Sequence, residues 1–94
     1  MQNTAQFLLQ DWFNITGRGL VITGEIIRGT IAAGDFVCFN DEVIKIKSVE
    51  IGHKSSGGFF IGLILEIENQ TPILSSLKKL KGENFLILTA VAVN

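Results

Sequence analysis

Five glycines punctuate the stretch from Phe13 to Val37, and they constrain the fold more than any other feature of the chain. Between them, apolar side chains such as Leu20 and Ile22 recur with period two, which is typical of half-buried β-strands. Glycine has no Cβ, so it marks tight turns, bends and close backbone approaches. The stretch therefore predicts two strands with glycine turns at Gly17, Gly19, Gly29 and Gly34, and we expect a positive φ at Gly34. Gly24 lies inside a strand and suggests a bend at a corner of a barrel.

The rest of the chain also indicates β-structure. Short strands are expected over residues 35–40 and 42–51, and longer ones over residues 59–67 and 84–93. In a first strand, one face is expected to carry Phe7, Leu9, Phe13 and Ile15, although the polar Asp11 falls in the same phase. Seven or so short strands with glycine turns suggest a small closed antiparallel β-barrel of about six to eight strands, because closure removes exposed sheet edges.

The strand expected at 42–51 contains a change of phase. Its apolar residues are even-numbered up to Ile46 and odd-numbered from Val49 onwards. A shift by one residue within a strand is what a β-bulge produces, so the pattern predicts a bulge near Lys47 and Ser48.

One short helical turn is expected near residues 72–81. Thr71 is suited to cap it, Pro72 to its first helical position and Gly82 to its end. The spacings of four and three residues would place one apolar face against the barrel, formed by Ile73, Leu77 and Leu80.

Composition narrows the class of protein. With 94 residues there is room for one domain and one core. The hydrophobic fraction of 47% and the mean hydropathy of +0.40 exclude a disordered chain. No apolar run is long enough to span a membrane, and residues 1–10 do not resemble a signal peptide, so we expect a cytoplasmic protein.

Charge and chemistry-bearing residues argue against several functions. The formal net charge of −1 disfavours generic nucleic-acid binding, which normally needs a basic surface. The glycine-rich stretch lacks the Gly-Lys-Ser/Thr of a phosphate-binding loop, so no nucleotide is expected. Since the chain has one histidine and one cysteine, we expect no metal and no cofactor, and Cys38 is expected to be a buried, inert thiol.

The stretch from Phe13 to Val37 resembles the opening of domain 2 of the elongation factor Tu-like translational GTPases, whose pattern runs roughly F-x-I-x-G-R-G-x-V-x-T-G-x-V-x-R-G-x-I-x-x-G-D-x-V. Looser likenesses extend it over roughly residues 7–90, at Asp11-Trp12-Phe13, Val49-Glu50-Ile51, Ile61-Gly62-Leu63 and residues 81–86. The resemblance implies a closed antiparallel barrel. In intact factors this barrel packs beside a GTPase domain and helps to hold the aminoacyl end of tRNA or contacts ribosomal RNA.

The sequence departs from the family's pattern at several positions, and these departures limit which of the family's functions can be expected of this chain. The segment after Val49-Glu50 shortens to residues 52–57, so the family's pocket for the aminoacyl group is expected to be incomplete. Phe59-Phe60 replaces a polar pair that precedes the Val-Gly step. The 94 residues contain no GTPase domain, and a copy without one cannot be a switchable delivery factor.

Three functions remain as alternatives. The first is a non-catalytic binding or assembly module, which would bind an unknown protein partner or a second copy through apolar residues on the outside of the barrel, Val21, Ile27, Phe60 and Ile64. The second is an RNA-contacting module acting on tRNA or the ribosome through Arg18, Arg28, His53 and Lys54. An enzyme would need His53 to act with Ser55 or Ser56, in a glycine-rich loop that offers no rigid frame, so we expect no catalysis.

Overall fold

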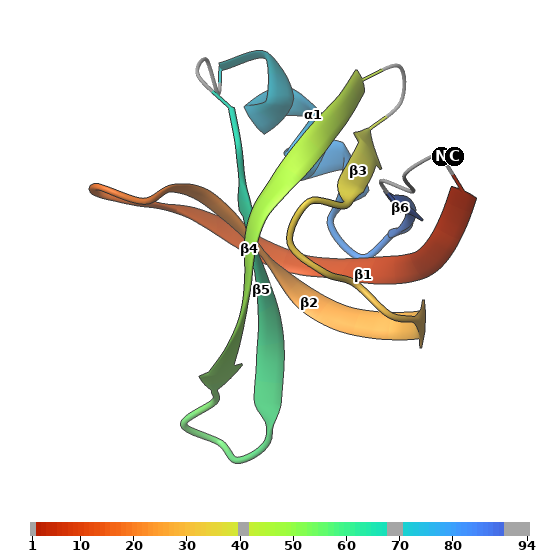
Figure 1. Cartoon of the computed structure of the whole chain (residues 1–94). Helices are drawn as coiled ribbons and strands as arrows, with labels where there is room; N and C mark the ends of the chain where they lie inside the picture. The colour runs from red at the N-terminus through yellow and green to blue at the C-terminus, as the bar shows by residue number, and fades with distance from the viewer. Residues whose placement is uncertain (1, 40–41, 68–70, 90–94) are drawn as a thin grey trace.

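The chain forms six strands and one helix in a computed structural model that describes residues 2–39, 42–67 and 71–89 (Figure 1). The elements follow one another as β1 (Gln2–Ile15), β2 (Gly19–Gly29), β3 (Phe36–Phe39), β4 (Glu42–His53), β5 (Phe59–Leu65), α1 (Thr71–Leu80) and β6 (Asn84–Thr89). The last strand expected from the sequence reached residue 93, and its final residues lie outside the described part of the chain.

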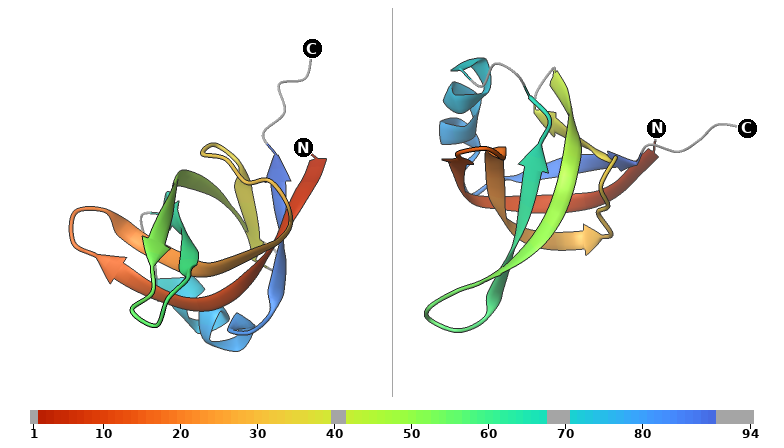
Figure 2. Two further views of the ribbon diagram at one scale, coloured as in Figure 1. Left: turned by 90° about the horizontal axis from the view of Figure 1, so that it is seen from below. Right: turned by 60° about the vertical axis from the view of Figure 1, so that its left-hand side comes forward.

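The strands close into an antiparallel barrel in the order β1-β2-β5-β4-β3-β6, with β6 pairing back onto β1. Figure 2 shows the ring from two further directions. The prediction of a small closed all-β barrel is therefore confirmed. Beyond the ring, the hairpin of β4 and β5 continues outwards as a projecting arm, which we define as residues 49–61 (Figure 1).

The inward side chains of all six strands form one core. Its fully buried members include Phe7, Leu9, Leu20, Ile22, Val37, Ile46, Leu63 and Ile87. The ring of Phe85 packs edge-on against Phe39 at a centroid distance of 4.8 Å and lies 6.3 Å from the ring of Phe7. Three strands thus meet at one aromatic cluster, which fills part of the barrel interior.

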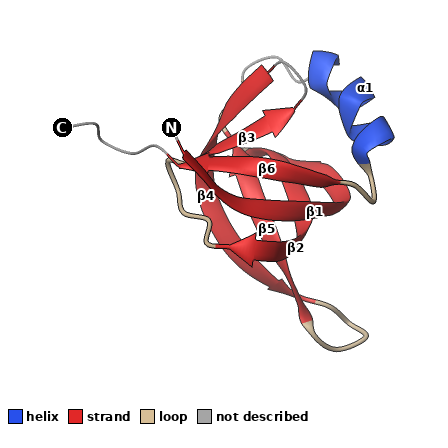
Figure 3. Cartoon of the chain, turned by 90° about the vertical axis from the view of Figure 1, so that its right-hand side faces the viewer, coloured by secondary structure: helices blue, strands red, loops and turns tan. Residues whose placement is uncertain are grey.

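Helix α1 packs against one end of the barrel, as Figure 3 shows. Ile73 and Leu77 are buried in the core, and Leu80 packs against it, which confirms the predicted apolar face. The helix ends before Gly82, whose φ of +87° suits a residue without Cβ. The backbone of Gly82 donates to the carbonyl of Leu9 at 2.8 Å, which ties the end of the helix to β1. Within the described residues, no helix has the length and apolar character needed to cross a bilayer.

The predicted bulge in β4 is confirmed. Ile46 lies opposite Leu65 of β5, and Ser48 lies opposite Ile64, so Lys47 is the extra residue. The bulge shifts the inward face from Ile46 to Val49, which packs against the core. Gly34 also has the expected positive φ, +96°, in the turn before β3.

A second bulge, in β1, overturns the expected face of the first strand. Leu9 lies opposite Gly24 and Asp11 lies opposite Thr23, so Gln10 is an extra residue. Phe7 and Leu9 are buried inside the barrel, whereas Phe13 lies on the outside with 43% of its surface exposed. The expectation that Phe13 and Ile15 share the inward face is wrong, because the bulge reverses the alternation after Leu9. Trp12 takes the inward phase and packs against the core.

The backbones of β1 and β2 approach each other closely at Gly24. A Cβ built on Gly24 would stand 1.8 Å from the carbonyl oxygen of Leu8, a backbone atom that cannot move aside alone. The expected role of Gly24 at a bend of the barrel therefore has a steric cause: only glycine allows the two backbones to meet beside the bulge at Gln10.

Replacing Gly24 with Ala should consequently lower the free energy of unfolding by about 3 kcal/mol, since the added methyl group overlaps a main-chain carbonyl. Urea unfolding followed by circular dichroism measures the change. Gly62→Ala is the matched control, because a Cβ there meets only Val21 Cγ1, at 3.5 Å. Equal midpoints for the two variants would contradict the steric role of Gly24.

Candidate functional site

A shallow hollow of ≈ 160 Å³ opens on the outside of the barrel, close to the hairpin between β1 and β2. We call it the outer groove. Four strands contribute to it: β1, β2, β5 and β4. Its lining is mainly apolar and comprises Phe13, Ile15, Arg18, Val21, Glu50, Ile51, Gly52, Phe60, Gly62 and Ile64.

Strand register brings these residues together. Phe13 lies opposite Val21, and Val21 lies opposite Ile64, so three apolar side chains form a row across neighbouring strands. Phe13 reaches this row only because the bulge at Gln10 turned it outwards. The row forms one wall of the outer groove.

Two glycines shape the floor of the groove. Gly62 of β5 faces outwards between Val21 and Glu50, and its missing side chain leaves room above the sheet. Gly52 of β4 lies opposite Phe60, whose ring covers it, since a Cβ on Gly52 would stand only 2.2 Å from Phe60 Cζ. The groove floor is therefore backbone, with an aromatic ring at one end.

An ion pair borders the groove. Both guanidinium nitrogens of Arg18 donate to the carboxylate of Glu50, and the Nη1–Oε1 distance is 3.0 Å. Ser48 Oγ donates to Glu50 Oε2 at 3.3 Å. Arg18 comes from the Gly17–Gly19 turn, which projects it over β4, so the pair links the hairpin to a strand far along the chain. Each side chain keeps nearly half of its surface exposed, 46% for Arg18 and 44% for Glu50.

Four residues were expected to form an exposed partner-binding face, and their exposure differs. Phe60 is half-buried and Ile27 is 48% exposed. Val21 and Ile64 lie on the outer face as expected, but they retain only 5% and 3% of their surface. The expectation that these two are exposed is wrong, because neighbouring groove residues cover them. Three of the four line the groove, while Ile27 lies elsewhere, at a register shift of β2 opposite β1.

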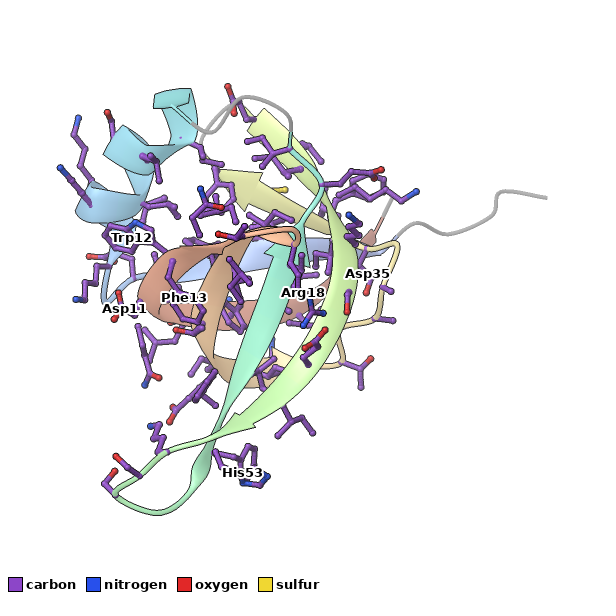
Figure 4. The ribbon with its side chains drawn as sticks, turned by 90° about the vertical axis from the view of Figure 1, so that its left-hand side faces the viewer. Asp11, Trp12, Phe13, Arg18, Asp35 and His53 are labelled. Atoms are coloured by element: carbon purple, nitrogen blue, oxygen red, sulfur yellow. The ribbon has the colours of Figure 1, made fainter. Side chains whose placement is uncertain are left out.

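The basic residues expected to contact RNA do not form one cluster. Arg18 is engaged by Glu50, and Arg28 lies near the opposite end of β2. His53 lies near the tip of the arm (Figure 4). Lys54 follows it in the chain, and both side chains are exposed. Lys54 lines a second, wider hollow of ≈ 510 Å³ between the arm and β2, together with Glu25, Ile26, Phe59 and Phe60.

Other chemistry-bearing groups are scattered. Cys38 lies in β3 and is half-buried rather than fully buried, and partial burial raises the pKa of its thiol. Trp12 is flanked by Lys81, whose Nζ lies 6.0 Å from the ring centroid. Over the described residues, no three side chains of His, Cys, Asp or Glu gather as metal ligands would.

Sequence reasoning missed the part played by Phe13, Ile15, Gly52 and Gly62 in the groove. The available signal was Asp11, a polar residue in the supposed inward phase, which marks the change of face in β1. No comparable signal pointed to Glu50 as the partner of Arg18, since 32 positions separate them. A scan against known protein families finds no family model that matches this chain.

The Arg18–Glu50 pair should add little to stability. Both partners are well exposed, so we expect Glu50→Gln to lower the free energy of unfolding by less than about 1 kcal/mol, with a smaller loss at high salt. Urea titrations at low and high salt measure this. Glu42→Gln provides the control, because Glu42 is an exposed β4 carboxylate that forms no ion pair within the described residues. A loss above about 2 kcal/mol would instead show the pair to be structural.

Proposed function

We propose that this chain is a non-catalytic binding module that docks a protein partner by accepting an apolar side chain of that partner in the outer groove. The observation that carries the proposal is the groove itself, an apolar hollow with a backbone floor at Gly62. Such hollows favour an inserted side chain, because the backbone floor allows close approach and the apolar walls gain from excluding water.

The borders of the groove support a peptide or protein as the occupant. Phe13, 43% exposed, can cover one side of an inserted side chain. Arg18 and Glu50 can exchange part of their mutual pairing for hydrogen bonds to a partner's backbone or polar groups, since both are partly solvated. An apolar centre with a charged rim is the usual arrangement of a protein-binding surface.

An RNA-contacting role is the second candidate, and one observation favours it. The groove is lined by residues from the segments that carry the resemblance to domain 2 of translational GTPases, including Ile15, Arg18, Val21 and Glu50. An unpaired base could stack in an apolar groove of this kind. It ranks second because the net charge is −1, Arg18 is paired with Glu50, and Arg28, His53 and Lys54 do not line the groove.

Selection of peptides from a random library, followed by affinity measurement, tests the proposal. We expect selected peptides to share an apolar anchor residue and to lose at least about tenfold in affinity for Gly62→Leu, whose side chain would fill the groove. Affinity should change little with salt, because apolar docking involves few ions. Ile27→Ser, on a different part of the barrel surface, is the control and should bind normally.

Two outcomes would overturn the assignment. Peptides that bind Gly62→Leu as well as the parent chain would remove the groove from the proposal. Binding of bulk tRNA that weakens steeply with salt and is lost in Gly62→Leu would favour the RNA candidate.

A further inference from the structure

The arm leaves one edge of β4 without a neighbouring strand. β3 pairs with β4 only as far as Lys45, and the last backbone bonds on that side join Ile46 to Gly34 and Asp35. From Val49 to His53, β5 occupies the other edge, and no strand of the described chain pairs with this one. The edge projects away from the barrel, as Figures 1 and 3 show.

Hydrogen-bond alternation identifies the groups on this edge. Lys54 donates its backbone N–H to Gly58 at 3.1 Å, which places that pair in a hydrogen-bonded position of the hairpin. Counting back along β4, residues 52 and 50 bond to β5, while Val49, Ile51 and His53 direct their N–H and C=O groups outwards. Three residues therefore present both a donor and an acceptor.

This edge lacks the usual protection against pairing with another strand. The segment from Ser48 to His53 contains neither proline nor lysine, which commonly block such pairing. Its single carboxylate, on Glu50, is balanced by Arg18. On the same face of the arm, Ile51 and Phe59 are 65% and 60% exposed, so apolar surface accompanies the open edge.

We propose that this edge of β4 is a self-association surface, at which two copies of the chain pair antiparallel about a two-fold axis through Ile51 to form a continuous β5-β4-β4-β5 sheet. Ile51 also borders the outer groove, but the proposed contact uses the backbone edge of β4 together with the face that Ile51 shares with Val49 and His53, whereas Glu50 and Gly52 lie on the opposite face.

The sequence around Ile51 suits pairing with itself. In this register Ile51 lies opposite Ile51 of the second copy, and Val49 lies opposite His53, which creates about six backbone hydrogen bonds. Glu50 lies opposite Gly52, so no like charges face each other across the joined strands. A shift that placed Glu50 opposite itself would bring two carboxylates together.

The contact also extends an existing apolar row. Ile61 of β5 lies opposite Ile51 and is partly buried against the core, so pairing would align four isoleucines across the joined sheet. The interface is nonetheless short and well below the roughly 800 Å² per partner of a standard complex, so we expect a dissociation constant on the order of 100 μM. A contact of this strength would join two copies of the chain where other interactions raise their local concentration.

Sedimentation equilibrium of the full chain, from about 10 μM to about 1 mM, tests the proposal together with amide hydrogen exchange by NMR. We expect a monomer–dimer equilibrium that is insensitive to salt, with the amides of Val49, Ile51 and His53 becoming protected as concentration rises. Ile51→Lys should weaken association at least about tenfold, because two ammonium groups would then face each other. Ile27→Lys is the matched control, since Ile27 is also a strand residue with about half its surface exposed.

Three other outcomes of these measurements would contradict self-association through this edge. A monomer throughout the concentration range, association that persists in Ile51→Lys, or protection confined to other residues would overturn the proposal. Thermal melts of Ile51→Lys verify that the variant is folded, and Ile51→Thr, which keeps a β-branched side chain, should retain pairing. Gly62→Leu should dimerise normally. The experiment therefore distinguishes a failure of the proposed peptide binding in the groove from a failure of the proposed pairing at the β4 edge.

Discussion

The close approach of β1 and β2 at Gly24 is the constraint on which much of this structure depends. The Leu8 carbonyl occupies the space in which any other residue would place its Cβ, and the bulge at Gln10 follows at once. That bulge reverses the faces of β1, so Leu9 completes the core while Phe13 turns outwards. The outer groove thus exists because two backbones meet where only glycine fits.

A second bulge, at Lys47, has the opposite effect on β4. It keeps apolar residues directed inwards as the strand bends, from Ile46 to Val49. Beyond the pair Gly24–Ile61, β2 and β5 are no longer paired, and the β4–β5 hairpin projects from the barrel. Apolar side chains such as Ile51 continue past the point where the barrel can cover them. The same strands therefore supply both a closed core and an open edge.

Sequence patterns predicted the bulge in β4 and missed the one at Gln10 in β1 for a specific reason. In β4 the apolar residues change phase, from Ile46 to Val49, so the bulge is visible. In β1 the residues after the bulge are apolar on the outer face, and Phe13 therefore continues the odd-numbered phase of Leu9. Only Asp11 disturbs that pattern. An outer surface that is itself apolar hides a change of face, because period-two reasoning assumes a polar exterior.

The sequence by itself determined the strands, the glycine turns, the apolar face of α1 and the closed barrel, because these depend on local spacing and on backbone freedom at glycine. Tertiary structure alone decided that Val21 and Ile64 are covered although they face outwards, and that Arg18 reaches Glu50. These outcomes depend on the register between strands far apart in the chain. That register is set by packing of the whole barrel, which no local pattern contains.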